Sequence, residues 1–213
     1  MKIIAHRGFW NKNIRANSSQ AFENAFKNDF GIEFDVRDLD GQLVISHDIP
    51  LKKDNLISFE DLLKLYKLFN KDLILAINIK SDGLQLKIKY LLEQYKIKNY
   101  FLFDMAVPDS VSYYKNGFKN IYTRQSEYET IPAFYEISQG IWMDEFNTEW
   151  IDEKIINKHF KNKKEIAIVS PELHKKDNHL TRWKFYKKLS CANRLAICTD
   201  YPDKAKDFFH DAK

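Results

Sequence analysis

The sequence predicts an α/β fold, a compact (β/α)8 TIM barrel that forms a single domain over residues 1–213. Short apolar segments typical of strands alternate with amphipathic segments typical of helices along the whole chain. Eight strand segments occur in this series, and eight parallel strands joined by right-handed crossovers close into a barrel. The sequence contains no linker or Pro- and Gly-rich break that would divide it. An open doubly wound sheet is the alternative.

Eight segments have the apolar body expected of buried strands. They are 2–8, 31–39, 73–80, 99–105, a part of 120–129, 140–146, 165–174 and 194–202. A ninth strand, 42–48, is predicted to return antiparallel to 31–39, because Asp40-Gly41 is a typical two-residue hairpin turn.

Seven segments between or after these strands have apolar residues at helical spacing or residues that cap helices. They are 17–30, 58–69, 84–95, 107–117, 150–160, 181–189 and 203–209. Asn17, with Gln20 three residues later, is the predicted N-cap of the first helix. Ser58 and Asp61 have capping-box spacing, and Gly117 is predicted to end the fourth helix.

The composition indicates a globular protein, since 44% of the residues are hydrophobic and 15% are aromatic. The net charge of +4 is small, and the lysines are spread along the chain. This spread is typical of lysines on solvent-exposed helix faces and not of a binding patch. We therefore expect no nucleic-acid partner and no stable membrane anchoring.

No segment has membrane-spanning length or the pattern of a signal peptide, so a cytoplasmic location is predicted. Cys191 and Cys198 are expected to be ordinary buried thiols.

Polar residues stand at the carboxyl end of each predicted strand, where the strands of a barrel converge on one mouth. They are His6 and Arg7, Glu33 and Asp35, His47 and Asp48, Asn78 and Lys80, Asp104, Arg124, Trp142 and Asp144, Glu172 and His174, and Asp200. Burying so many polar groups is costly unless they pair or bind a ligand. The pattern therefore predicts a polar cavity.

These residue types suit phosphodiester cleavage. Glu33 and Asp35 lie two apart on one strand, so they share a face and offer oxygen ligands to one divalent ion, Mg²⁺ or Ca²⁺. Two histidines, His6 and His47, can act as general acid and general base near neutral pH. The positive charges that can balance a phosphate are those of Arg7, Lys80 and Arg124.

At these residues the sequence resembles the glycerophosphodiester phosphodiesterases, relatives of the phosphatidylinositol-specific phospholipases C. The resemblance lies in "HRG" after the first strand, "N-S" before the first helix, "GIEFDVRDLDGQLVISHD" and the final "TDYPDKA". It implies a (β/α)8 barrel and the activity of a phosphoric diester hydrolase. By position it implies catalytic roles for His6 and His47, metal ligation by Glu33 and Asp35, and phosphate contacts by Arg7 and Lys80. The family reaction is an attack on phosphorus by a neighbouring substrate hydroxyl, after which water opens the cyclic product.

The sequence departs from the family pattern at two positions. Asn78 stands in "NIK", where the family has an acidic metal ligand, and the amide removes one negative charge from the site. Asp104 or Asp144 is the predicted compensating ligand. Ala16 precedes Asn17, where the family has a glutamate. Both changes make the predicted mouth less acidic, which favours a shift in substrate or metal affinity over a loss of catalysis.

The predicted function is that of a metal-dependent phosphodiesterase that hydrolyses a glycerophosphodiester or a glycerol-phosphate-linked sugar or nucleotide. Trp142 and His174 are further candidates for contact with this small-molecule substrate. A phospholipase-type diesterase that acts on lipid head groups is a second hypothesis, against which we expect no exposed apolar loop near the N-terminal motifs. A non-catalytic phosphate-binding barrel is a third, and the missing acidic residue at Asn78 is its support. The sequence does not predict an oligomeric state.

Overall fold

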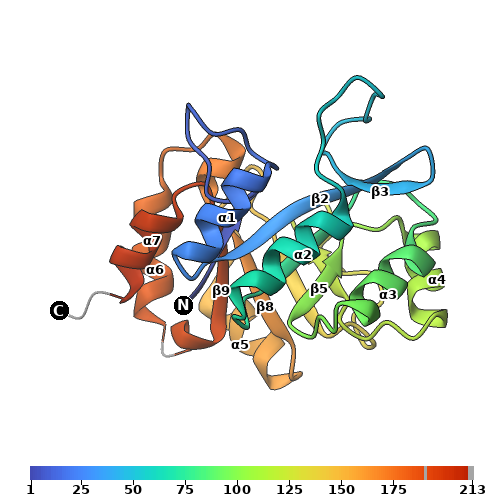
Figure 1. Ribbon diagram of the computed structural model, residues 1–213. Coiled ribbons are helices and arrows are strands. Elements are labelled where there is room, and N and C mark those ends of the chain that lie inside the picture. The colour runs from blue at the N-terminus through green and yellow to red at the C-terminus, as the bar shows by residue number, and fades with distance from the viewer. Residues whose placement is uncertain (190, 211–213) are drawn as a thin grey trace. The chain divides into compact units, whose positions relative to one another are not determined.

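The computed structural model describes residues 1–189 and 191–210, with its helices and strands labelled in Figure 1. These residues form two compact units. One consists of Met1–Ala5 with the described residues that follow Lys119, and the other of His6–Lys119. The single domain over residues 1–213 stays a prediction.

The unit His6–Lys119 contains a parallel sheet with the strand order β5–β4–β2. These strands are β2 (Gly31–Leu39), β4 (Leu75–Ile79) and β5 (Tyr100–Phe103). Strand β3 (Gln42–Ile45) returns antiparallel to β2, as predicted, with Leu39 opposite Gln42. Asp40 and Gly41 both have positive φ, 49° and 80°, as a two-residue hairpin turn requires. The register between β2 and β4 places Asp35 beside Asn78.

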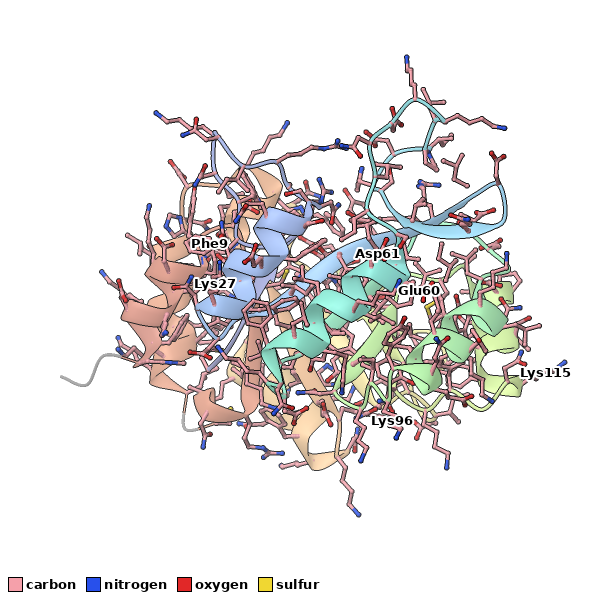
Figure 2. The ribbon with its side chains drawn as sticks, viewed as in Figure 1. Phe9, Lys27, Glu60, Asp61, Lys96 and Lys115 are labelled. Atoms are coloured by element: carbon pink, nitrogen blue, oxygen red, sulfur yellow. The ribbon has the colours of Figure 1, made fainter. Side chains whose placement is uncertain are left out.

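Four helices belong to this unit. They are α1 (Ser19–Lys27), α2 (Phe59–Phe69), α3 (Gln85–Gln94) and α4 (Val107–Lys115). Ser58 caps α2 as predicted, since its hydroxyl accepts the backbone N–H of Asp61 at 3.0 Å, and Figure 2 shows Asp61 at the start of that helix. The predicted N-cap of α1 is wrong. Ser18, not Asn17, caps that helix by accepting the N–H of Ala21.

The core of this unit is largely aromatic. Phe22 of α1 packs edge-on against Phe34 of β2, which also contacts Phe59 of α2. All three rings are fully buried. Helices α1 and α2 lie side by side over this core (Figure 1). The aromatic contacts therefore join β2 to both helices.

The other unit contains a parallel sheet with the strand order β1–β9–β8–β7–β6. Its strands are β1 (Lys2–His6), β6 (Tyr122–Gln125), β7 (Gly140–Met143), β8 (Glu165–Val169) and β9 (Leu195–Thr199). The last residue of β1, His6, belongs to the unit His6–Lys119. Its helices are α5 (Glu153–Lys161), α6 (His179–Lys188) and α7 (Pro202–His210). The described residues thus contain eight strands in parallel pairings and the antiparallel return β3, as the sequence predicts.

The strand predicted over 165–174 is too long. Strand β8 ends at Val169, and Pro171–His174 form a short 3₁₀ helix. Pro171 has no backbone N–H to donate to a neighbouring strand and favours the first turn of a helix. Glu172 and His174 therefore follow the strand on a helical turn.

Cys191 and Cys198 are free and buried, as expected. Among the described helices, none is both long and apolar enough to cross a membrane.

A buried histidine joins α5 to the segment after β6. The imidazole of His159 is 2% exposed and has a partner on each nitrogen. Tyr135 Oη lies 2.9 Å from Nδ1, and Gln125 Oε1 lies 2.8 Å from Nε2. Burial, together with the charges of Lys158 and Lys164, lowers the pKa of His159 to about 4. The folded protein therefore keeps this ring neutral.

We expect the free energy of unfolding to fall as the pH is lowered from about 6.5 to 4. In that range the unfolded chain binds a proton at His159 and the folded chain does not, so acid favours unfolding. The expected loss is about 2–3 kcal/mol. Urea unfolding at pH 7 and pH 4.5 measures it. The His159→Gln variant should lose this part of the pH dependence, and an unchanged slope would contradict the assignment.

Candidate active site

Two buried carboxylates form the centre of a polar cluster in the unit His6–Lys119. Glu33 and Asp35 lie two residues apart on β2, so both side chains project from the same face of the strand. They are only 2% and 1% exposed. Two charges this deeply buried cost several kcal/mol unless cations or hydrogen-bond donors compensate them.

Two basic side chains compensate the charge of Asp35. Arg7, the residue after β1, places Nε 3.1 Å from Asp35 Oδ2. Lys80, the residue after β4, places Nζ 3.5 Å from Asp35 Oδ1 and 3.8 Å from Asp104 Oδ2. Asp104 follows β5 and joins the cluster through this lysine. Two predicted cations thus pair with one carboxylate, and a third predicted residue, Asp104, pairs with one of these cations.

Glu33 contacts a different set of groups. His6 Nε2 lies 3.8 Å from Glu33 Oε2, which also accepts the backbone N–H of Arg7 at 3.3 Å. The amide Nδ2 of Asn78 donates to Glu33 Oε1 at 3.2 Å. Burial, and then the neighbouring charge of Asp35, raise the pKa of Glu33 to about 7. The environment of Glu33 therefore favours an additional positive charge.

Asn17 also belongs to this cluster, although its sequence position predicted only a helix cap. Its Nδ2 donates to Asp35 Oδ2 at 2.8 Å, and its backbone N–H donates to the carbonyl of Arg7 at 2.9 Å. Both Asn17 and Arg7 adopt left-handed backbone conformations, with φ of 55° and 56°. This conformation is unfavourable for arginine and occurs mainly where the surrounding structure enforces it, often at functional sites.

The loop that follows β1 packs tightly against α1. Gly8 has φ of 86°, and a Cβ on it would lie 2.8 Å from the carbonyl carbon of Ala21. The next residue, Phe9, donates its N–H to Ala21 O at 2.9 Å. The indole of Trp10 donates to the carbonyl of His6 at 2.9 Å. Close approach at Gly8 and these two hydrogen bonds position the backbone that carries His6.

The oxygen atoms of this cluster fit a hard divalent cation. The Oδ1 atoms of Asn17, Asp35 and Asn78 are buried and accept no hydrogen bond from the described residues. Carboxylate and amide oxygens are the ligands that Mg²⁺ and Ca²⁺ prefer. Residues 1–189 and 191–210 contain no group of three or more His, Cys, Asp or Glu side chains placed to hold an ion. A metal here would therefore depend on amide oxygens as well as on the two carboxylates.

His47 stands apart from these contacts. It lies in the segment after β3, and its side chain is 47% exposed. Its Nδ1 is 2.8 Å from Asp48 Oδ1, and within the described residues this is the side chain's hydrogen-bond partner. The hydrogen bond to His47 is the main reason why the pKa of Asp48 is lowered. A proton on Nδ1 leaves Nε2 as the acceptor nitrogen.

A second polar cluster, in the other unit, contains Asp144, Arg124 and His174. Asp144 follows β7, and its Oδ1 lies 2.5 Å from His174 Nε2. Arg124 of β6 places Nε 3.8 Å from Asp144 Oδ2. The ring of Phe146 packs 4.6 Å from that of His174. Trp142, on β7, is 4% exposed. The structure thus brings three of the predicted site residues, Arg124, Asp144 and His174, together. The carboxylate of Asp144 contacts the side chains of the other two.

Glu172 has a structural role between β8 and β9. Its carboxylate accepts the backbone N–H of Asp200 at 3.1 Å and the hydroxyls of Ser170 and Thr199. These hydrogen bonds account for the carboxylate of Glu172 at this position, so no bound ligand is needed to explain it.

A buried ion pair that the sequence analysis did not predict supports the segment after β7. Arg182 donates from Nε and Nη2 to the two carboxylate oxygens of Glu145, at 3.0 and 2.8 Å. The same carboxylate accepts the N–H of Ile151 at 2.9 Å. Glu145 and Arg182 are 2% and 6% exposed. Since Glu145 directly follows Asp144, this pair fixes the backbone of the second cluster.

Neither protein-family models nor curated proteins match this sequence. Solved structures do match its fold. A protein assigned as a glycerophosphodiester phosphodiesterase from Galdieria sulphuraria is 16% identical with a TM-score of 0.77, over 99% of this chain and 98% of that one.

Two further solved structures match this chain, also at low sequence identity and over nearly the whole of both chains. A glycerophosphodiester phosphodiesterase from Parabacteroides distasonis is 18% identical with a TM-score of 0.69, over 98% of this chain and 96% of that one. A phosphodiesterase from Oleispira antarctica, solved in complex with its product sn-glycerol-3-phosphate, is 14% identical with a TM-score of 0.69, over 99% of this chain and 97% of that one. Over nearly its whole length the chain therefore has the fold of solved glycerophosphodiester phosphodiesterases, and the predicted (β/α)8 barrel is confirmed.

Proposed function

We propose that this protein is a phosphodiesterase that hydrolyses a glycerophosphodiester or a glycerol-phosphate-linked sugar or nucleotide. The observation that carries the proposal is the cluster around Glu33 and Asp35. His6, Arg7 and Lys80 all lie within 4 Å of one of these two carboxylates. The fold shared with solved phosphodiesterases supports the same activity.

In the proposed reaction, a histidine accepts the proton of the attacking substrate hydroxyl, and a second histidine donates a proton to the leaving alcohol. His6 and His47 take these roles and exchange them when water opens the cyclic phosphodiester. The hydrogen bond that His47 Nδ1 donates to the carboxylate of Asp48 supports a base at Nε2 of His47. The guanidinium of Arg7 and the ammonium of Lys80 stabilise the phosphate charge that develops in the transition state.

Glu33, Asp35 and Asn78 would hold one divalent ion, with Asn17 and Asp104 beside them. Such an ion, when bound, polarises a phosphoryl oxygen as a Lewis acid. The protein's own contribution is a buried pair of carboxylates, and the side chains of Arg7 and Lys80 both pair with Asp35. Substrate contact by Arg124, Trp142 and His174 and metal ligation by Asp144 stay predictions, which rest on the rule that barrel enzymes bind substrates at the carboxyl ends of their strands.

The test is hydrolysis of glycerophosphocholine, bis(p-nitrophenyl) phosphate and a wider panel of diesters, with Mg²⁺, Ca²⁺ or Mn²⁺ and with EDTA. We expect turnover of at least one diester and its loss in EDTA. If no diester is hydrolysed but phosphate esters bind, the chain is a non-catalytic phosphate-binding barrel. The hydrogen bond that Asn78 donates to Glu33 favours that second function, because it occupies a carboxylate oxygen that a metal would use.

Asn78→Asp is expected to tighten binding of Mg²⁺ or Ca²⁺ by about tenfold or more. The substitution removes the amide donor to Glu33 and adds a third carboxylate, so the empty site becomes more repulsive and the loaded site more stable. Thermal unfolding titrated with the metal measures the affinity without an activity assay. Asn13→Asp makes the same charge change on an exposed loop and should leave the midpoint unchanged. An equal midpoint for Asn78→Asp would place Asn78 outside the metal shell.

A further inference from the structure

The segment between β3 and α2 is a closed loop that presents apolar side chains to solvent. Its ends are joined by the hydrogen bond from the N–H of Ile45 to the carbonyl of Ile57, at 2.9 Å. Within it, Asp54 closes a tight turn, since its carboxylate accepts the N–H of Leu51 at 2.8 Å and its own N–H donates to Leu51 O at 2.9 Å. Loop 46–57 therefore has its own internal hydrogen bonds, as compact surface loops do.

Ile49 is 77% exposed and Leu51 is 50% exposed. The expectation of no exposed apolar loop near the N-terminal motifs is therefore wrong, because these two side chains follow His47 within four residues. Single exposed apolar residues are common on protein surfaces. Here Ile49 and Leu51 flank Pro50 within a loop whose backbone is held by hydrogen bonds, so the fold keeps both side chains in solvent.

Two basic side chains of the same loop stand next to its apolar residues. Lys52 and Lys53 directly follow Leu51, and Lys53 forms no ion pair with any described residue. The nearby acidic groups are engaged locally, since Asp40 pairs with Lys52, Asp48 with His47 and Asp54 with the Leu51 N–H. Figure 1 shows this loop and the loop after β1 projecting on the same side of the unit. The loop after β1 carries the exposed Lys12 and Arg15.

We propose that loop 46–57 docks the protein reversibly on an anionic membrane surface. Ile49 and Leu51 enter the boundary between head groups and acyl chains, while Lys52 and Lys53 contact anionic head groups. Apolar insertion combined with basic residues is the combination that binds peripheral proteins to such surfaces. The inference deepens the proposed function, because the docked loop begins at His47 and would bring that histidine to phosphodiesters of lipid head groups.

The test is co-sedimentation of the full chain with phosphatidylglycerol vesicles and with phosphatidylcholine vesicles, at low and high salt. We expect binding to phosphatidylglycerol that weakens as salt rises. The double variant Ile49→Ser/Leu51→Ser should lower partitioning at least about tenfold. Lys52→Gln/Lys53→Gln should lower it about tenfold on anionic vesicles and leave binding to phosphatidylcholine unchanged.

Leu86→Ser/Tyr90→Ser is the matched control, because both residues are 66% exposed on α3 and lie outside the loop. This variant should bind like the parent chain. Absence of vesicle binding, or equal losses in the control and the loop variants, would overturn the proposal. Sedimentation needs no turnover, so its result is independent of the proposed activity. Hydrolysis of glycerophosphocholine should be unchanged in the Ile49→Ser/Leu51→Ser variant.

Discussion

His6→Ala and His47→Ala are each expected to lower kcat for a glycerophosphodiester by about 10²–10⁴-fold. In the proposed reaction each imidazole transfers one of the two protons, so either substitution removes half of the acid–base pair. His6 lies 3.8 Å from the buried Glu33, and His47 has Asp48 on its Nδ1. Steady-state kinetics with glycerophosphocholine measure the loss, and circular dichroism checks that the variants fold.

His210→Ala is the matched control, since this histidine contacts the backbone carbonyl of Met1 and has no proposed role. Its kcat should equal that of the parent chain. Asp48→Asn should have a smaller effect than His47→Ala, because it removes the group that orients the ring and not the ring itself. Full turnover in either His6→Ala or His47→Ala would contradict the acid–base assignment.

Arg182→Met is expected to destabilise the protein by about 3–5 kcal/mol, because it leaves the charge of Glu145 buried without its partner. For a chain of this size the melting temperature should fall by about 10 °C. Denaturant unfolding and thermal unfolding both measure the effect.

The double variant Glu145→Leu/Arg182→Met should recover much of this loss, since it removes both buried charges together. Arg15→Met removes an exposed arginine and should change stability by less than about 0.5 kcal/mol. A double variant as unstable as Arg182→Met alone would show that packing, and not the unpaired charge, sets the cost.

The central carboxylate pair could be predicted from the sequence because its geometry is local. Residues two apart on a strand share a face, so Glu33 and Asp35 had to project together. Lys80 and Asp104 were predictable for a related reason, since the carboxyl ends of parallel neighbouring strands lie at one edge of a sheet. The alternation of strands with helices likewise predicted the fold.

Contacts that depend on irregular backbone could not be predicted in this way. Asn17 reaches Asp35 because the chain before α1 takes a left-handed conformation, and its helix-capping residue type pointed to another role. The contact between His174 and Asp144 joins residues 30 apart and requires the 3₁₀ turn that follows β8. The pairing of Glu145 with Arg182 joins two residues whose charges, read from sequence, are typical of a surface.

The close approach of Gly8 to Ala21 has a mechanical consequence for the proposed active site. With no space for a methyl group between them, helix α1 and the turn bearing His6 must shift as one body. Any mutation or ligand that displaces this helix by a few tenths of an ångström will be transmitted to the imidazole, so residues on the far side of α1 can influence turnover without touching substrate.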